Sequence, residues 1–448
     1  MPVIGSDRVR AVVGLGTTGL STARFLATKG IDFYVVDSRL SPPGLEEVQK
    51  ICPQERIYLG DFEVLLNLGV TELYVTPGIS LATPVLRTLA DQGVVMRGDV
   101  DLFCDYANAP IIAITGSNAK STVTTLVGGM LQALGKNAGI GGNLGLPALD
   151  LLADDIDYYV LELSSFQLET THRLAAEVAC ILNVSEDHMD RYDSLYDYQR
   201  VKQSIYRNCQ AALYNKQDIL TAPLLPVGTP SCVFTAAAPD LNEFGLLPDD
   251  NGFWLSYGVE RLYHSDNIAL KGTHNLANVL AALGMLHLLG LTVKDERIGR
   301  YLNQVTGLKH RCELAGNIDR VDYINDSKGT NVGATIAALE GLGSDKKNIH
   351  LILGGVGKGA NFAPLKPHVE RFVKQVYLFG QDASLIAENL PNSVVQHSYQ
   401  SLDEIIVQAH QQALAGDIVL FSPACASFDM YDNFNVRGEH FMALVSAL

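Results

Sequence analysis

The chain has 448 residues, of which 47% are hydrophobic and 18% charged, so it is long enough for two to three globular domains and too apolar to be disordered. Its formal net charge of −16 argues against a nucleic-acid partner, because the phosphates would be repelled. Seven scattered cysteines without metal-ligand spacing, and a start without a signal peptide's charged and apolar regions, predict reduced thiols in a cytoplasmic protein.

The first hundred residues alternate strand and helix. We expect strands at 9–15, 31–36 and 72–76, and a helix at 22–29. The turn GLGTTG lies between the first strand and that helix, and Asp37 ends the second strand. This is the dinucleotide fingerprint of a Rossmann-like domain, and taken alone it predicts an NAD- or FAD-dependent dehydrogenase. The alternative is that the glycines only allow the helix to pack against the strand.

A second glycine turn follows a short apolar strand at 111–114 and precedes a helix at 122–134. Gly116 permits a tight turn, and Lys120 adds a mobile positive charge beside the N–H groups of the helix start. Such a turn can hold a nucleoside triphosphate, with a hydroxyl free for Mg²⁺. Ala119 stands where the general phosphate-loop pattern has glycine, which is tolerable if its φ is negative. An ordinary strand-to-helix turn is the alternative interpretation.

The rest of the middle segment predicts further strands and helices. Strands are expected at 158–163, 178–184 and 211–214, a helix at 196–208, and a small antiparallel insertion within 216–265. The apolar run 276–293 is interpreted as a buried helix that ends at Gly290 rather than as a membrane span. Residues 293–307 are a candidate hinge.

Polar residues near this second turn are candidates for a metal and nucleotide site. Glu162 and His188 follow two predicted strands and could each ligate Mg²⁺, although either could also be an ordinary cap or polar residue. Lys202 is expected to be an exposed lysine on its helix. Asn275 is interpreted as the cap of the long helix, and Asn278 could contact a base or ribose.

The last third repeats the α/β pattern, with strands at 349–353, 375–379 and 417–421. Lysines, an arginine and hydroxyls follow these strands and predict a site for a small dicarboxylate or a phosphate. The candidate residues are His310, Arg311, Asp326, Lys328, Thr330, Lys358, Ser427 and Phe434. The predicted fold class is therefore α/β in three domains: an N-terminal Rossmann-like domain (1–98), a central P-loop-type ATPase domain with a mostly parallel sheet and a small antiparallel insertion (99–304), and a C-terminal Rossmann-like domain (305–448).

Taken together, the motifs TGSNAKST, LELSSFQLE, NVSEDHMDRY, HNLAN, GLKHR, NDSKGTN, GGVGKGANF and SPACASFD resemble those of the Mur ligases over essentially the whole chain. The resemblance is strongest to the members that add D-glutamate to UDP-N-acetylmuramoyl-L-alanine in peptidoglycan precursor synthesis. It implies ATP-dependent amide formation through an acyl phosphate, with ADP and phosphate released. In this interpretation the N-terminal fingerprint binds UDP rather than NAD.

The resemblance also implies roles for individual residues. ATP would be held by Gly116, Ser117, Asn118, Ala119, Lys120, Ser121, Thr122, Asn275, Asn278, His310, Arg311 and Asp326. Two Mg²⁺ ions would be held by Ser121, Thr122, Glu162, His188 and Lys202 in a carbamylated form. The UDP-sugar would contact Thr17, Thr18, Asp37, Ser38, Arg39, Gly78 and Asn143. D-Glutamate would contact Lys328, Thr330, Lys358, Ser427, Phe428 and Phe434. The residues expected to be catalytic are Lys120, Lys202, His188 and Lys358.

Partners are expected to be these small molecules alone, with no nucleic acid and no membrane, for a monomeric cytoplasmic enzyme. The sequence departs from the usual family residues at Ala119, Lys309, Gly329 and Val356. Three alternatives stay open at this point: a nicotinamide dehydrogenase, a non-enzymatic nucleotide-binding regulator, and a ligase of the same class that adds another amino acid.

Overall fold

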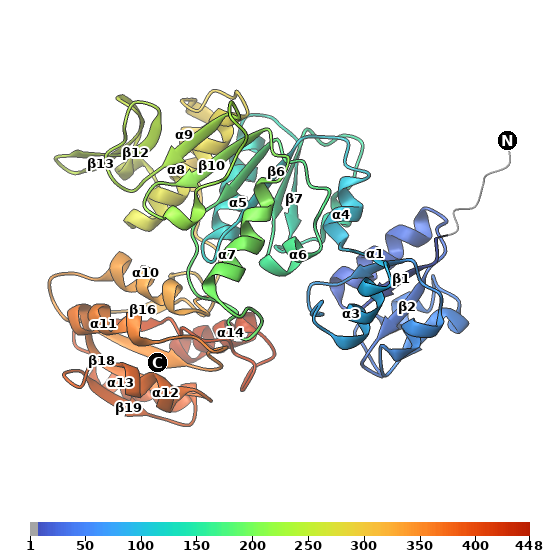
Figure 1. Cartoon of the computed structure of the whole chain (residues 1–448). Helices are drawn as coiled ribbons and strands as arrows, with labels where there is room; N and C mark the ends of the chain where they lie inside the picture. The colour runs from blue at the N-terminus through green and yellow to red at the C-terminus, as the bar shows by residue number, and fades with distance from the viewer. Residues whose placement is uncertain (1–7) are drawn as a thin grey trace.

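Three sheets follow one another along the chain in the computed structural model, which describes residues 8–448 (Figure 1). The N-terminal sheet is entirely parallel, in the order β3-β2-β1-β4-β5. Its strands are β1 (Arg10–Val13), β2 (Tyr34–Asp37), β3 (Ile57–Leu59), β4 (Glu72–Val75) and β5 (Val95–Arg97), and its helices are α1 (Thr17–Thr28), α2 (Leu45–Val48) and α3 (Pro84–Asp91). The strand order reverses between β1 and β4, which is where doubly wound sheets bind ligands.

The first helix was predicted too short. It begins at Thr17 rather than at residue 22, so three residues of the predicted glycine turn, Thr17, Thr18 and Gly19, form its first turn. Gly19 tolerates no side chain, because a Cβ there would lie 1.9 Å from the carbonyl oxygen of Gly14. The glycines of this turn therefore bring α1 close to the end of β1.

The central sheet has nine strands in the order β14-β13-β12-β11-β10-β9-β6-β8-β7. They are β6 (Ile111–Thr115), β7 (Ala138–Gly142), β8 (Tyr158–Glu162), β9 (Val178–Ile181), β10 (Ala211–Asn215), β11 (Ser231–Phe234), β12 (Glu243–Asp249), β13 (Gly252–Tyr257) and β14 (Glu260–His264). The predicted antiparallel insertion is only partly correct. β11 and β12 extend the parallel sheet from β10, and only β13 and β14 are antiparallel.

Helices cover both faces of the central sheet. They are α4 (Asp99–Cys104), α5 (Lys120–Ala133), α6 (Ser165–Glu169), α7 (Leu195–Gln203), α8 (Thr273–Leu288) and α9 (Glu296–Gln304). α5 and α8 share one apolar core with the sheet, which confirms that the apolar run after 275 is a buried helix. Among residues 8–448, no helix has both the length and the apolar character needed to cross a bilayer.

Two other expectations for this domain were wrong. The candidate hinge at 293–307 is largely the helix α9, which buries Ile298 and Leu302. The helix predicted at 196–208 ends as an α-helix at Gln203 and continues as one 3₁₀ turn over Ser204–Tyr206.

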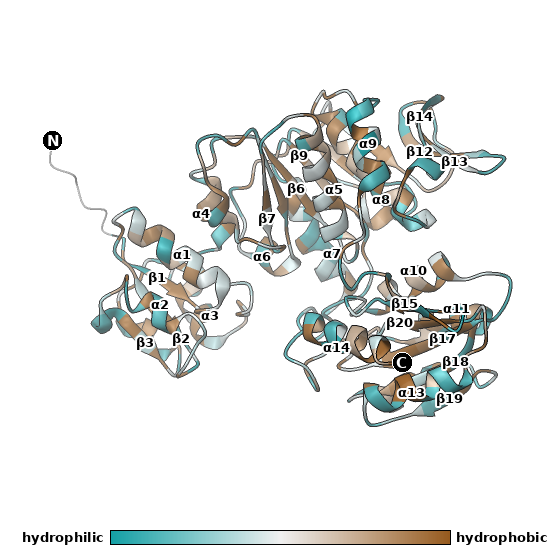
Figure 2. Ribbon diagram, turned by 180° about the vertical axis from the view of Figure 1, so that it is seen from behind, coloured by the Kyte–Doolittle hydropathy of each residue, from teal (hydrophilic) through white to brown (hydrophobic). Residues whose placement is uncertain are grey.

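The C-terminal sheet has the order β15-β16-β20-β17-β18-β19 and is parallel apart from the β15–β16 pair. Its strands are β15 (Glu313–Ile318), β16 (Val321–Asn325), β17 (Ile349–Gly354), β18 (Val373–Phe379), β19 (Val395–Ser398) and β20 (Ile418–Phe421), and its helices are α10 (Val332–Leu342), α11 (Lys366–Phe372), α12 (Ala383–Asn389), α13 (Leu402–Gln412) and α14 (Phe434–Ser446). The strands of this sheet and of the central one are mostly apolar, whereas polar residues gather on the outer helices and loops (Figure 2). The predicted fold class, three α/β domains in series, is confirmed.

Candidate active site

The turn between β6 and α5 is tied into the central domain by its own polar residues. Ser117 Oγ accepts a hydrogen bond from the Ser185 amide at 2.9 Å, and the Asn118 amide donates to Asn183 Oδ1 at 2.8 Å. Ala119 has a φ of 65°, so the expectation of a negative φ was wrong. The left-handed residue lets the chain turn directly into α5, whose first residue is Lys120.

Two lysine side chains meet at this turn. Lys120 Nζ donates to the carbonyl oxygens of Gly116 at 2.8 Å and Ser117 at 3.0 Å. Lys202 Nζ donates to the same Gly116 oxygen at 2.9 Å and lies 4.4 Å from the centre of the Tyr198 ring. Lys202 is buried, contrary to the exposed position expected from its helix, because Tyr198 and Lys202 share the inward face of α7. Burial, reinforced by the nearby positive charge of Lys120, lowers the pKa of Lys202 well below its ordinary value.

The two metal candidates lie close to the turn but differ in their surroundings. Glu162 Oε1 accepts a hydrogen bond from Asn143 Nδ2 at 2.6 Å, whereas its Oε2 is buried with no partner among the described residues. Burial lowers the pKa of His188 to about 4, so its imidazole is neutral at pH 7. Within residues 8–448 no three His, Cys, Asp or Glu side chains cluster as a metal cage. The free carboxylate oxygen and the hydroxyls of Ser121 and Thr122 are oxygen ligands that suit a Mg²⁺–nucleotide complex completed by phosphate and water, whereas the neutral imidazole of His188 is an unusual ligand for so hard an ion.

A cavity of about 220 Å³ lies beside the turn, between α8 and α10. Seven of the predicted ATP-binding residues line it: Asn118, Ala119, Thr122, Asn275, Asn278, Arg311 and Asp326. Asn275 is not the helix cap, since Gly272 occupies that position and Asn275 Nδ2 donates to the Lys271 carbonyl at 2.8 Å. Its neighbour Asn278 donates to Asn275 Oδ1 at 3.3 Å. Both amides therefore face one another in the first turns of α8.

His310 does not line this cavity. It is buried in the C-terminal domain, where its Nδ1 lies 2.9 Å from Asn325 Nδ2 and its ring packs against Gly438. The cavity also has lining residues that the sequence did not single out: Leu182, Asn183, Asn215, Phe234, His274, Ala277, Cys312, Ala334, Ala337 and Ala338. Asn215 ends β10 and Asn183 follows β9, so the strand-end rule that selected Glu162 and His188 could also have found them.

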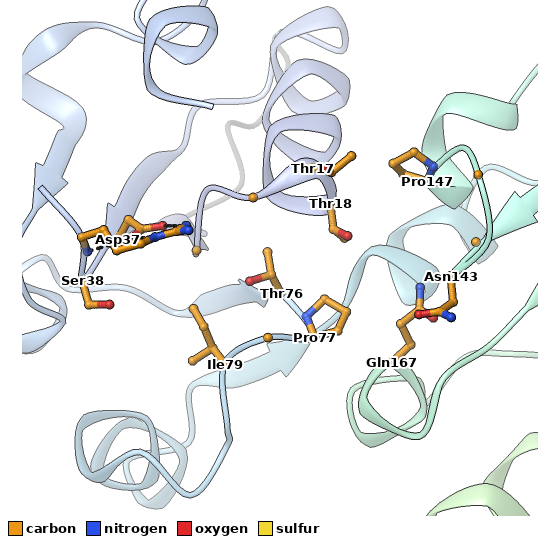
Figure 3. Close-up of a pocket in the computed structure, with 16 residues that line it drawn as sticks. Thr17, Thr18, Asp37, Ser38, Thr76, Pro77, Ile79, Asn143, Pro147 and Gln167 are labelled. Carbon is orange, nitrogen blue, oxygen red and sulfur yellow. Dashed lines mark hydrogen bonds and ion pairs between the residues drawn. The ribbon is translucent and has the colours of Figure 1, made fainter. Parts of the chain in front are cut away.

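A larger cavity of about 560 Å³ opens between the N-terminal and central domains (Figure 3). All seven residues predicted to bind the UDP-sugar line it: Thr17, Thr18, Asp37, Ser38, Arg39, Gly78 and Asn143. Gln167, Thr76, Pro77, Ile79 and Pro147 line it as well and were not predicted. Asn143 and Gln167 belong to the central domain, so the cavity is complete only when both domains are in place.

Asp37 is already saturated by hydrogen bonds. It accepts from the Leu15 amide at 2.6 Å, the Arg39 amide at 2.8 Å, and Arg39 Nε and Nη2 at 2.9 and 2.7 Å. Burial opposes its ionisation, but the hydrogen bonds from Arg39 and Leu15 outweigh it and lower its pKa. The carboxylate that a dinucleotide ribose would need is thus engaged by Arg39, which argues against the dehydrogenase alternative.

The C-terminal domain brings two lysines to the central turn. Lys328 Nζ donates to Ser121 Oγ at 2.9 Å and lies 5.1 Å from the centre of the Phe434 ring. Burial lowers the pKa of Lys328 to about 8, with the charge of Arg311 acting in the same direction. Lys358 forms an ion pair with Asp187. Among the described residues, these contacts join the lysines to central-domain partners.

The other predicted D-glutamate residues lie on the loops around these lysines. Thr330 is half-buried beside Lys328, Ser427 is buried, and Phe428 is exposed. Arg437 was missed: it is buried on α14, and its Nη2 donates to the carbonyl oxygens of Ser327 at 2.8 Å and Cys425 at 3.0 Å. It ties together the two loops that carry Lys328 and Ser427. An arginine on the inward face of an apolar helix was the signal in the sequence.

Comparisons with known proteins agree with the arrangement of three α/β domains along the chain. Three family models match: Mur ligase MurD-like, N-terminal domain (residues 8–98), Mur ligase middle domain (114–286) and Mur ligase, glutamate ligase domain (310–425). The UDP-N-acetylmuramoylalanine--D-glutamate ligases of Marinobacter nauticus and Pseudomonas aeruginosa are each 49% identical to the chain, over the whole of both proteins. The chain belongs to the Mur ligase family.

Solved structures share the fold at lower sequence identity. The MurF ligase from Thermotoga maritima in complex with ADP aligns with a TM-score of 0.61 and 16% identity, covering 99% of this chain and 96% of its own. The UDP-N-acetylmuramate-alanine ligase from the same organism aligns with a TM-score of 0.60 and 16% identity, covering 98% of this chain and 99% of its own.

Proposed function

We propose that the protein is an ATP-dependent ligase that adds D-glutamate to UDP-N-acetylmuramoyl-L-alanine, releasing ADP and phosphate, in cytoplasmic peptidoglycan precursor synthesis. The names of relatives that are 49% identical over the full length support this substrate pair. The observation that carries the proposal is the position of Asn143. It lines the 560 Å³ cavity and donates to Glu162 beside the phosphate loop, so one residue links the wall of the larger cavity to the nucleotide site.

The reaction needs positioning and charge neutralisation more than covalent help from the protein. An oxygen of the substrate's terminal carboxylate attacks the γ-phosphorus of ATP, and the bond to ADP breaks. The D-glutamate amine then attacks the acyl carbon and phosphate leaves, with loss of one proton from nitrogen. Lys120, at the Gly116 and Ser117 carbonyls, and Lys328, at Ser121, neutralise the transferring phosphoryl group. D-Glutamate is oriented by Lys358 and Lys328 together with Ser427, Phe428, Phe434 and Thr330.

Glu162, His188, Ser121, Thr122 and a carbamylated Lys202 would hold two Mg²⁺ ions. Bound there, Mg²⁺ would neutralise phosphate charge and keep the acceptor oxygen in line. The unpartnered Glu162 Oε2 and the neutral His188 are consistent with this role. Lys202 would contribute by adding its neutral amine to CO₂, which yields a carbamate and one proton.

The test is phosphate release by the purified chain with Mg²⁺, ATP and both co-substrates. D-Glutamate should support release together with the amide product, and L-glutamate should not. Lys120→Ala should abolish turnover, whereas Lys216→Ala, at an exposed lysine paired with Asp240 and Glu243, should not. ATP binding without amide formation would favour a regulator, and turnover with a different amino acid would favour another ligase of the class. A single-subunit mass by light scattering is expected for the proposed monomer.

A further inference from the structure

The nucleotide cavity is a slot between two helices from different domains. α8 of the central domain contributes His274, Asn275, Ala277 and Asn278 to its lining. α10 of the C-terminal domain contributes Ala334, Ala337 and Ala338. These alanines and Gly341 follow the i, i+3, i+4, i+7 spacing of one helix face, so α10 presents its smallest side chains along this side.

His274 belongs to the first turn of α8, and its ring contacts α10 at Gly341, so it closes the outer end of the slot. A Cβ placed on Gly341 of α10 would lie 2.7 Å from both Cε1 and Nδ1 of the imidazole. A Cβ on Gly272, which precedes α8, would lie 2.9 Å from Cε1. Neither position has room for a side chain, so the ring is seated between the backbones of two glycines from the two domains.

The imidazole makes this contact without a hydrogen bond at Nδ1. That atom is buried and has no partner among the described residues. Burial lowers the pKa of His274, which keeps the ring uncharged near neutral pH. A neutral planar ring held between two backbones fills space rather than pairing charges.

α10 is fixed at its other end too. Asn331, which caps it, donates from Nδ2 to Asn118 Oδ1 at 3.1 Å and to Asp187 Oδ2 at 3.0 Å. The helix is therefore anchored to the phosphate loop at its start and to α8 through His274 near its end. Between these two anchors lies the slot.

We propose that His274 is a positioning residue, a planar spacer that sets the separation of α8 and α10 to the width of a flat aromatic base. This rests on the proposed function, because it assigns the slot to the base of ATP. A slot held open before the nucleotide arrives avoids the cost of ordering two domains around it. The spacer acts through ring shape and the contact with Gly341, and it contributes to nucleotide binding more than to turnover.

Four variants test the spacer: His274→Ala, His274→Phe, Gly341→Ala and the double variant. We expect His274→Ala to weaken ADP binding, measured by calorimetry with Mg²⁺, by about tenfold. His274→Phe should restore most of that affinity, because phenylalanine keeps the ring and removes its nitrogens. Gly341→Ala should weaken ADP binding to a similar extent by displacing the ring, yet should add nothing when His274 is already alanine.

Kinetics separate the spacer from a general structural role. The KM for ATP should rise in His274→Ala and Gly341→Ala, with kcat and the KM for the UDP-sugar changed much less. Alanine favours a helix more than glycine does, so Gly341→Ala is expected to leave α10 folded, as circular dichroism and thermal unfolding would verify. A destabilised fold would instead weaken the binding of every substrate.

Three results would overturn the inference. One is a His274→Phe variant that binds ADP as weakly as His274→Ala, which would assign the role to a ring nitrogen. The second is a Gly341→Ala effect that persists in full in the double variant, and the third is wild-type binding by all four variants. ADP binding is measured without turnover, so the outcomes stay distinct. A wild-type protein that binds ADP but forms no amide would contradict the proposed function alone, whereas four variants that all bind like wild type would contradict only the spacer.

Discussion

At Lys202, burial and a neighbouring positive charge both disfavour the charged form of the side chain. Its amine shares the Gly116 carbonyl with Lys120, and it is 1% exposed. Two ammonium groups at one oxygen repel each other, and burial disfavours the charged form of each. The lowered pKa of Lys202 favours the neutral, nucleophilic amine beside the proposed metal site.

Carbamylation of Lys202 is therefore expected to be required for full activity. Depleting CO₂ from the enzyme and its buffers should reduce phosphate release, and added bicarbonate should restore it. A carbamate carbon signal should appear in wild-type protein equilibrated with ¹³C-labelled CO₂, and it should be missing from Lys202→Arg, whose guanidinium stays charged. Activity indifferent to CO₂ and bicarbonate would rule against the modification.

Asp99 carries a buried carboxyl group that destabilises the fold at neutral pH. It begins α4, is 3% exposed, and its carboxylate oxygens make no well-formed hydrogen bond among the described residues. Burial raises its pKa from an ordinary 3.8 to about 6, and weak contacts with the amides of Asp99 and Val100 and with the Gln167 side chain offset only part of that rise. Because the folded state holds the proton more tightly, stability falls as pH rises from about 4 to 6, and the full cost is present above.

Asp99→Asn should therefore stabilise the protein at pH 7 to 8 by about 1–3 kcal/mol. The gain should shrink as the pH falls and vanish below about 4, where wild-type Asp99 is protonated in both states. Urea unfolding of both proteins across this pH range measures the effect. An equal gain at every pH would mean that something other than the charge is responsible.

Site residues that lie next to one another in the sequence were easier to predict than buried residues that hold the site in place from distant segments. The seven residues Gly116–Thr122 form one contiguous segment, the turn after β6 and the start of α5, so their proposed role in nucleotide binding could be predicted from short-range sequence. Arg437 and His274 act through contacts with residues of distant segments, at Cys425 and Gly341, which no local pattern encodes. Lys202 was placed at the site only through the family resemblance, because helix periodicity does not reveal which neighbour a lysine faces.

At the scale of turns and helices, several residues other than glycine that have a left-handed backbone conformation lie around the site. Among the described residues, Ala119, His188, His310, Cys312 and Lys358 all have φ between 43° and 65°. Such residues are strained, and surrounding contacts must hold them in place. At each of these residues the chain changes direction, at a strand end or a domain junction. Sequence patterns do not reveal such a left-handed backbone conformation.

Ala119→Gly should relieve this strain at the phosphate loop. A non-glycine residue in the left-handed region costs about 1–2 kcal/mol, whereas glycine loses about 0.5–1 kcal/mol through the entropy of the unfolded chain. The net expectation is a gain of up to about 1 kcal/mol in the free energy of unfolding, read from urea titrations. Ala119→Val should destabilise the protein instead, since a β-branched residue fits that region worst. Equal effects of the two substitutions would contradict a strained turn.

The order of strands and helices could be predicted well, but their lengths and partners could not. β6, β8 and β9 were predicted within a few residues because buried parallel strands are continuous apolar runs. The helix predicted in place of α1 was too short because Thr17 and Thr18 look like turn residues. The pairing of β11 with β10 was missed because parallel pairing joins separate segments, and the Pro- and Gly-rich alternations of 216–265 favoured antiparallel hairpins instead.

On the scale of the whole molecule, the sites belong to domain junctions rather than to single domains. The larger cavity needs Asn143 and Gln167 from the central domain, and the nucleotide slot needs α10 from the C-terminal domain. The C-terminal domain lies beside the central one (Figure 1), and Lys328 and Asn331 join the two through hydrogen bonds to Ser121 and Asn118. Closing such junctions around bound substrates would exclude water from the acyl phosphate.

Arg191 holds the junction between the N-terminal and central domains. Its Nη1 and Nη2 donate to the carbonyl oxygens of Pro77 at 3.0 Å and Ile79 at 3.3 Å, two residues that line the larger cavity. The same guanidinium pairs with Glu169 at 2.5 Å and lies 4.2 Å from the centre of the Phe166 ring. The half-buried guanidinium of Arg191 therefore fixes one wall of the UDP-sugar cavity to the domain that carries its opposite wall.

Arg191→Ala should raise the KM for the UDP-sugar about tenfold or more, because two hydrogen bonds from a charged donor are lost across the junction. The KM for ATP should change little, since the nucleotide slot lies at the other junction. Arg191→Lys should restore only part of the affinity, as an ammonium cannot make the forked contact. Arg200→Ala, at an arginine whose side chain is 70% exposed, is the matched control and should behave like wild type. A rise in both KM values together would show that Arg191 supports the fold in general rather than this junction.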